Sequence, residues 1–164
     1  MTHVLDILQE RGLMEGGTSI EETRQALAKP VALYCGFDPT ADSLHLGSLV
    51  PLIGLKWFQK CGHHPIALVG GATGMIGDPS GKAKERQLLD EKTIASNLMG
   101  IRKNIEKFLD APTILNNLDW FRHFSCISFL RDVGKLIRMG PMLSRESVKL
   151  RLDSEEGMSF TELC

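Results

Sequence analysis

Two short apolar runs, each followed by a loop and then by a stretch of helical length, constrain the fold of this chain most. The runs are "VALYCGF" at residues 31–37 and "PIALVGG" at residues 65–71. A third short run, "TILNN" at 113–117, follows a long amphipathic stretch at 91–109. Continuous apolar runs of this length are typical of strands buried in a parallel sheet. Their alternation with helices predicts an α/β fold with helices on both faces of that sheet.

Start and stop signals predict the helices. A capping box at "SIEE" (residues 19–22) opens a helix that we expect to end at Pro30. Pro51 falls in the first turn of the helix expected at 46–62, where the missing N–H costs little. Further helices are expected at 3–11, 91–109, 128–138 and 141–152.

Length, charge and cysteine content narrow the class of protein. The 164 residues suffice for one domain with a real core, and the net charge of -1 argues against a small dedicated nucleic-acid-binding domain, which is normally basic. The 4 cysteines form no C-x-x-C pair, which favours a reducing, cytoplasm-like compartment. No apolar run approaches membrane-spanning length, and "CGHH" at 61–64 lacks the second ligand pair of a zinc site. We therefore expect no membrane and no metal site.

Two unusual loops, at residues 36–46 and 70–81, follow the first two predicted strands. Parallel strands end at one edge of their sheet, and ligands bind outside that edge, so both loops are expected there. The second loop is no P-loop, because Ile76 stands where that motif has its first glycine and Ala83 follows Lys82. It also lacks the G-x-G-x-x-G spacing of dinucleotide-binding loops.

The first loop ends in "HLGS" at a predicted helix start. Free N–H groups and the helix dipole favour an anion there, and the His45 imidazole could donate to a phosphate oxygen. Gly47 would let a ligand approach the backbone without a Cβ in the way. The alternative is an ordinary residue before a helix, with its imidazole satisfied by solvent or by a neighbouring carbonyl.

The other candidates also have two interpretations. Asp78 either receives a ligand's ammonium group or forms an ordinary turn with Pro79. Tyr34 and Cys35 face opposite sides of their strand, and packing in the core is the alternative for both. For the basic cluster that includes Lys82, a solvated surface is the default explanation.

The stretches "LYCGFDPTADSLHLGS" and "ALVGGATGMIGDPSGK" resemble tyrosyl-tRNA synthetases of the bacterial and organellar type, which are class I aminoacyl-tRNA synthetases. The similarity continues through "NNLDW", "FLRDVGK", "SRESVKLRL" and "EGMSFTE". It implies a Rossmann-like parallel sheet of the HUP-type nucleotide-binding class, with an N-terminal helical segment at 1–30 and the catalytic domain from 31 to 164. It also implies activation of tyrosine with ATP and Mg²⁺, transfer to tRNA(Tyr), a homodimer, and a cytoplasmic or organellar location.

The resemblance assigns roles to individual residues. "HLGS" takes the place of the family's HIGH motif, with Ser48 where the second histidine usually contacts the ribose, and a serine hydroxyl could still make that hydrogen bond. Catalytic roles are implied for Thr40, His45, Lys82 and Arg86; tyrosine binding for Tyr34, Asp78 and Asn117; ATP binding for Cys35, Gly36, Asp38, Gly47 and Ser48; and a dimer contact for Phe160.

The last residues carry a second capping box, Ser159 to Glu162, which announces a helix two residues before the sequence stops. We therefore expect a truncated chain that contains only the N-terminal portion of the catalytic domain. In the family, further tyrosine-pocket residues, the KMSKS loop and the tRNA-binding regions follow, so we expect little activity from residues 1–164 alone. The alternatives are a non-catalytic dimerisation or binding fragment and a nucleotidylyltransferase with an H-x-G-H-type loop.

Overall fold

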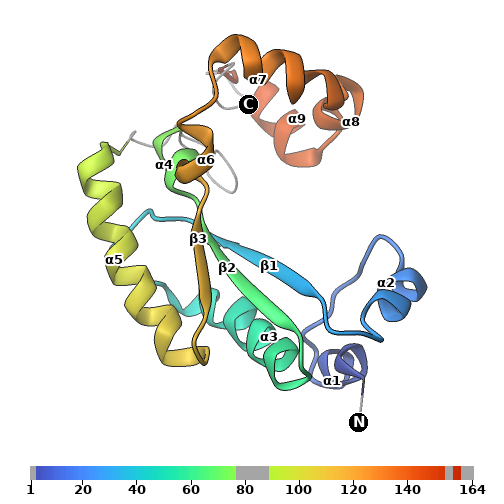
Figure 1. Ribbon diagram of the computed structural model, residues 1–164. Coiled ribbons are helices and arrows are strands. Elements are labelled where there is room, and N and C mark those ends of the chain that lie inside the picture. Colours follow the sequence, from blue (N-terminus) through green and yellow to red (C-terminus); the bar gives the residue numbers. More distant parts are fainter. Residues whose placement is uncertain (1–2, 77–88, 154–156, 160–164) are drawn as a thin grey trace.

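A computed structural model describes residues 3–76, 89–153 and 157–159 of the chain (Figure 1). Helices and strands alternate through its first two thirds, and short helices make up the rest. In chain order the elements are α1 (Val4–Glu10), α2 (Ile20–Ala26), β1 (Ala32–Phe37), the 3₁₀ turn η1 (Leu46–Ser48), α3 (Leu49–Lys60), β2 (His64–Val69), α4 (Gly71–Ile76), α5 (Glu91–Phe108), β3 (Thr113–Asn116), α6 (Leu118–Phe121), α7 (Cys126–Asp132), the 3₁₀ turn η2 (Gly134–Leu136), α8 (Met139–Leu143) and α9 (Glu146–Leu152).

The three strands form a parallel sheet in the order β1-β2-β3, which confirms the α/β prediction. In its register Cys35 lies opposite Ala67, which in turn lies opposite Ile114. The side chains at these positions share one face, and α3 and α5 pack on it (Figure 1). The buried core between sheet and helices consists of Phe37, Leu52, Leu55, Ala67, Val69, Ile101, Ile105 and Leu109.

The opposite face of the sheet is open at several positions. Tyr34 on β1 is 69% exposed and Leu115 on β3 is 42% exposed. The two described helices that pack on the sheet, α3 and α5, both lie on the other face, so the expectation of helices on both faces is wrong for the described part of the chain. The physical reason is the strand order. Successive right-handed crossovers that step in one direction across a sheet place their helices on the same side.

The N-terminal helices begin as their capping signals predict. The Ser19 hydroxyl accepts a hydrogen bond from the Glu22 N–H at 3.4 Å, which confirms the capping box, although α2 ends at Ala26, before Pro30. Helix α1 packs on α3 and buries three apolar side chains. The guanidinium of Arg11 lies 4.4 Å from the centroid of the Trp57 ring and adds a cation–π contact between the two helices.

Helix α4 occupies the first half of the segment predicted as a glycine-rich loop, so that prediction is wrong for residues 71–76. Its glycines serve close packing. A Cβ on Gly71 would lie 2.2 Å from the Asn116 side-chain oxygen, and one on Gly74 would lie 2.9 Å from the Pro39 ring. Because the helix is pressed against neighbouring segments at both positions, larger residues would not fit.

The C-terminal third is more broken than predicted. The helix expected at 128–138 is divided into α7 and η2, and the one expected at 141–152 into α8 and α9. At the second break the Ser144 hydroxyl donates to the Pro141 carbonyl at 2.9 Å, a local bond that competes with helix continuation. Helix α6, directly after β3, was not predicted. None of the helices in the described ranges is long and apolar enough to cross a membrane.

Candidate functional site

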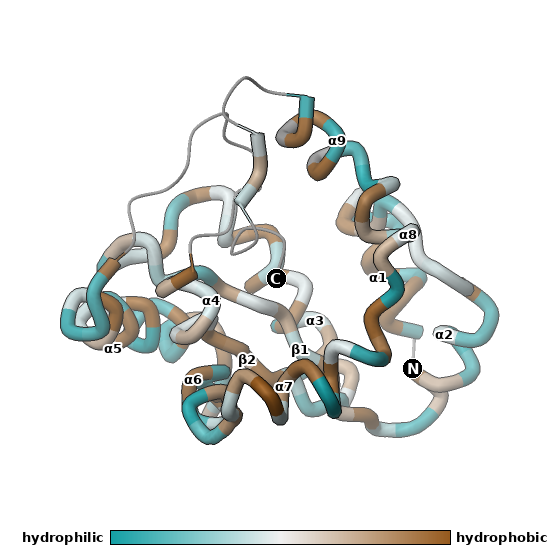
Figure 2. Tube along the Cα trace, turned by 90° about the horizontal axis from the view of Figure 1, so that it is seen from above, coloured by the Kyte–Doolittle hydropathy of each residue, from teal (hydrophilic) through white to brown (hydrophobic). Residues whose placement is uncertain are grey.

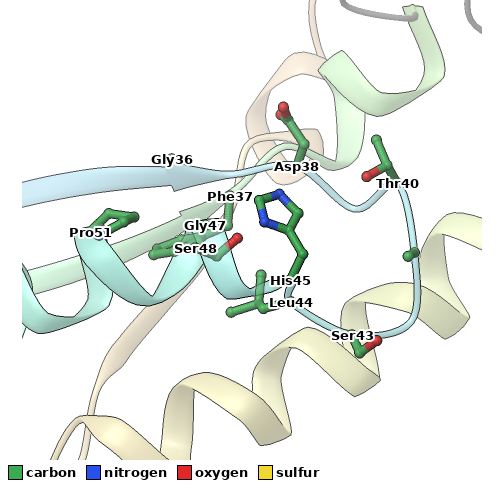
Figure 3. Close-up of a pocket in the computed structure, with 11 residues that line it drawn as sticks. Gly36, Phe37, Asp38, Thr40, Ser43, Leu44, His45, Gly47, Ser48 and Pro51 are labelled. Carbon is green, nitrogen blue, oxygen red and sulfur yellow. The ribbon is translucent and has the colours of Figure 1, made fainter.

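A cavity of about 440 Å³ opens between the carboxyl end of β1 and the start of α3 (Figure 3). It lies at the sheet edge where α/β folds bind ligands, as the sequence predicted. Six of the predicted site residues line it, namely Gly36, Asp38, Thr40, His45, Gly47 and Ser48. The other lining residues are Phe37, Ala41, Ser43, Leu44 and Pro51.

His45 stands at the N-cap position of η1 with extended backbone (φ -85°, ψ 169°) and makes no side-chain cap. Its exposed imidazole points from the loop toward the end of β1, between Asp38 and Ser48 (Figure 3). A Cβ on Gly47 would lie 2.9 Å from the imidazole Cε1 and 3.0 Å from Nδ1. Gly47 therefore leaves room for the His45 ring itself, which lies against the helix start.

Polar groups of other kinds surround the imidazole. Thr40 and Asp38 are exposed, and Ser48 is half-buried at the first turn of α3. The Asp38 carboxylate also faces the end of β2, where its Oδ1 lies 3.4 Å from the position of a Cβ on Gly70. Gly70 N–H donates to the Phe37 carbonyl at 3.0 Å and so ties the ends of β1 and β2 together.

The pocket combines hydrogen-bond donors, one carboxylate and the start of a 12-residue helix. N–H groups and the positive end of the dipole at such a start favour phosphate or carboxylate groups. Lysine and arginine are not among the residues lining the described cavity. Within residues 3–76, 89–153 and 157–159, no group of three His, Cys, Asp or Glu side chains could hold a metal ion. The helix start and the hydroxyl and imidazole donors could hold an anionic ligand, whereas the Asp38 carboxylate opposes one.

Tyr34 and Cys35 do not line this cavity. Tyr34 projects from the open face of the sheet, whereas Cys35 is half-buried and packs against the core under α3 and α5. Burial raises the pKa of the Cys35 thiol, and a weaker backbone hydrogen bond at Gly36 opposes this effect. The ATP-binding role of Cys35 and the tyrosine-binding role of Tyr34 stay predictions.

Asn117 is buried and its side chain is already engaged. Its Oδ1 accepts from the Ala72 N–H at 2.7 Å, and its Nδ2 donates to the Thr73 hydroxyl at 3.3 Å. Asn116 similarly accepts from the Gly71 N–H at 3.1 Å. The two asparagines thus cap the first turn of α4 from the end of β3. The predicted contact of Asn117 with tyrosine stays a prediction, and the amide's observed role is to hold α4.

The remaining predicted residues, Asp78, Lys82, Arg86 and Phe160, lie outside the described residues. Sequence reasoning missed the contacts that hold the pocket loop from below. Asn97 and Asn104 of α5 bond to the backbone of Pro39 and Leu44. The available signal was two asparagines on the buried side of an amphipathic helix, seven residues apart, with a glycine between them.

Comparison with known proteins gives one family. A family model described as "tRNA synthetases class I (W and Y)" matches residues 26–164. The chain is 66% identical over 170 residues to a tyrosine–tRNA ligase of Protochlamydia amoebophila (strain UWE25), covering 100% of this chain and 40% of that protein. It is 50% identical to the chloroplastic/mitochondrial tyrosine–tRNA ligase of Arabidopsis thaliana, covering 98% of this chain and 33% of the relative.

Solved structures agree. A C-terminally truncated mitochondrial tyrosyl-tRNA synthetase of Aspergillus nidulans superposes with a TM-score of 0.86 at 31% identity, covering 99% of this chain and 51% of that one. The Coccidioides posadasii counterpart gives a TM-score of 0.82 at 32% identity. The chain therefore spans between one third and two fifths of the curated relatives named above, and about half of this Aspergillus chain.

Proposed function

The chain belongs to the class I tRNA synthetase family of tryptophan and tyrosine, and we propose that it forms part of the catalytic unit of a tyrosine–tRNA ligase. Tyrosine is preferred over tryptophan because the two relatives described above are both named tyrosine–tRNA ligases. The observation that carries the proposal is the cavity between β1 and α3, which is lined by an imidazole, three hydroxyls and a helix start. Such a cavity suits the phosphates of ATP.

The proposed reaction has two steps. A carboxylate oxygen of tyrosine attacks the α-phosphorus of ATP, the bond to the bridging oxygen breaks, and pyrophosphate leaves with that electron pair. A hydroxyl oxygen of tRNA(Tyr) then attacks the carbonyl carbon of the tyrosyl-adenylate and loses its proton. The bond from that carbon to the phosphate oxygen breaks, and AMP leaves with the electron pair. Negative charge grows on the phosphate oxygens during the first step, and donors fixed at that place stabilise it best. His45 and Thr40 are suited to this role, since both line the pocket and are exposed there.

The pocket is consistent with Mg²⁺ arriving on ATP. Mg²⁺ at nucleotide sites is held mainly by substrate phosphates and water, with one or two protein carboxylates. Asp38 is the carboxylate among the cavity residues, and it is exposed. Bound to the phosphates, the ion would neutralise part of their charge, while the chain's own residues orient the nucleotide.

Replacement of His45 tests the catalytic proposal. In a form of the protein that spans the length of its relatives, His45→Ala should lower the rate of tyrosine-dependent ATP–pyrophosphate exchange by about 100-fold, the usual cost of one transition-state donor. The KM for tyrosine should change little, because the imidazole lies at the phosphate end of the site. His64→Ala is the matched control, since His64 is an exposed histidine at the opposite end of the sheet. Exchange at the wild-type rate in the His45 variant would refute the proposal.

We also propose a homodimer, supported by the α7–α9 apolar surface, which is defined here by exposed apolar side chains on these short helices and the turns between them. Figure 2 shows hydrophobic (brown) stretches of the chain in this region. Exposed apolar patches of this kind mark interaction sites. Its residues are Ile127, Leu130, Leu136, Ile137, Met139, Leu143, Leu150 and Leu152.

The double substitution Ile127→Asp and Leu136→Asp places two charges on side chains that are each 73% exposed. We expect a dimeric wild type and a monomeric, folded variant by light scattering with circular dichroism. Met99→Asp is the control, because Met99 is also exposed (63%) but lies on α5. A variant that stays dimeric would place the interface elsewhere, and a monomeric wild type would contradict the homodimer.

The names of the relatives, one bacterial and one chloroplastic/mitochondrial, support a cytoplasmic or organellar location.

A further inference from the structure

Helix α5 lies beneath the loop that follows β1 and carries three small or polar residues on the side that meets it. Asn97 is 8% exposed, and its Nδ2 donates to the Pro39 carbonyl at 2.9 Å. Two turns further on, the Asn104 Oδ1 accepts from the Leu44 N–H at 3.0 Å. Positions 97, 100 and 104 share one face of a helix, so the third member of this row is Gly100.

Gly100 is the point of closest approach. A Cβ added to it would lie 1.8 Å from the Asp42 carbonyl oxygen, where real Cβ contacts essentially never fall below 3.0 Å. The loop backbone therefore occupies the space that any other residue would fill. Together the three residues hold the loop along its length. The Asn97 donor binds its beginning, the absent side chain of Gly100 makes room for its middle, and the Asn104 acceptor binds its end.

The loop is also fixed from the other side. Pro39 is almost fully buried, and its ring lies so close to α4 that a Cβ on Gly74 would meet it at 2.9 Å. Thr40, Ala41 and Ser43 of the loop are exposed and line the cavity, and His45 follows directly after Leu44. A shift of the loop backbone would carry both side chains with it.

We infer that Asn97, Gly100 and Asn104 of α5 are positioning residues that fix the loop 39–44, and with it Thr40 and His45, at the pocket. The inference rests on the proposed function for its catalytic consequence, but not for the holding of the loop. The three residues touch no substrate themselves. They act through the loop backbone, by setting where the phosphate-facing groups stand.

The two asparagines predict opposite responses to the same change. At Asn104, aspartate keeps an oxygen that accepts from the Leu44 N–H. At Asn97, aspartate loses the donor and places a carboxylate against the Pro39 carbonyl. Asn104→Asp should therefore retain the wild-type rate within about twofold, whereas Asn97→Asp should lose about as much as Asn97→Ala, roughly tenfold. A role in general stability alone would not give this reversal.

Gly100→Ala is the strongest test, because the loop or the helix must move by more than 1 Å to admit the methyl group. Misplacement of catalytic groups by about 1 Å costs about 100-fold in rate. Gly54→Ala is the matched control, since a Cβ at this interior position of α3 meets nothing within 4 Å. It should leave the rate of exchange unchanged.

Two measurements test the inference. Both use wild type and variants of a protein that spans the length of its relatives. Amide hydrogen exchange by mass spectrometry should show faster exchange in peptides covering 38–45 for Asn97→Ala, Gly100→Ala and Asn104→Ala, and unchanged exchange for Gly54→Ala and Asn104→Asp. ATP–pyrophosphate exchange should show a lowered kcat with a nearly constant KM for tyrosine in the same three variants.

Unchanged amide exchange in the loop, or a loosened loop with a wild-type kcat, would overturn the inference while leaving the proposed function intact. An inactive wild-type protein would overturn the proposed function and the catalytic half of the inference. A fall in kcat of equal size for the aspartate variants at 97 and 104 would also refute it, because the donor and acceptor roles would then be irrelevant.

Discussion

Asn117 is expected to stabilise the fold through the first turn of α4. Its Oδ1 accepts from the Ala72 N–H at 2.7 Å, in a buried bond. Ala72 is 8% exposed and Asn117 is 7% exposed, so water has little access to replace the acceptor. The N–H groups of a first helical turn have no partner within their own helix. Asn117→Ala therefore leaves a buried donor unsatisfied.

The magnitude follows from this bond. An unsatisfied buried backbone donor costs about 1–3 kcal/mol. The second bond, from Nδ2 to the Thr73 hydroxyl at 3.3 Å, adds little, because that hydroxyl also donates to the Gly70 carbonyl at 3.3 Å. We expect Asn117→Ala to lower the free energy of unfolding by about 2 kcal/mol. For a chain of this size, Tm should fall by about 6 °C.

Urea unfolding followed by circular dichroism measures the change, with the midpoint shifting and the m value constant. Asn117→Leu separates the hydrogen bond from the cavity, because leucine fills the volume without offering an acceptor. It should be about as unstable as the alanine variant. Gln9→Ala, which removes an exposed amide on α1, is the control. A loss below about 0.5 kcal/mol in Asn117→Ala, the range of surface substitutions, would refute the reasoning.

Two further predictions concern titratable groups. Burial, and then the charges of His3 and His64, lower the pKa of His63 from its ordinary 6.5. On acidification the unfolded state therefore binds the proton at a higher pH than the folded state does. The free energy of unfolding should fall as the pH drops below 6.5. His63→Asn, which keeps an acceptor for the Val31 N–H, should flatten this slope in urea unfolding, and an unchanged slope would contradict the assignment. Burial raises the pKa of the Cys35 thiol. At about pH 8 the exposed Cys126 should therefore react with a disulfide reagent about tenfold faster than Cys35 does. Equal rates in single-cysteine variants would argue against a half-buried Cys35.

Elements with strong local signals were predictable. The three strands lie within one or two residues of the apolar runs, because β-type residues buried on at least one face dominate those segments. The start of α2 follows from a bond that Ser19 makes within its own turn. The start of α3 was misjudged by three residues, since "HLGS" begins as the 3₁₀ turn η1.

Helix α4 could not be predicted, because its sequence, "GATGMI", contains two glycines, and glycine disfavours helices. Gly71 and Gly74 are instead explained by neighbours far away in the sequence, the Asn116 side chain and the Pro39 ring. The ATP-binding role of Cys35 came from the resemblance and stays a prediction, while strand alternation turns its side chain toward the core. Residues that are close in sequence share the pocket only where the backbone lets them face it.

The four asparagines of the chain show why the pocket geometry is not local. Each bonds to the backbone of a segment that follows a strand, Asn97 and Asn104 to the loop after β1, Asn116 and Asn117 to α4 after β2. The partners are separated by 45 to 60 residues in the chain. The motif "HLGS" lines the pocket, but residues of α5 and of the end of β3 hold the segments around it. A chain that ended before α5 would keep every predicted pocket residue of β1 and its loop and lose the contacts that fix their positions.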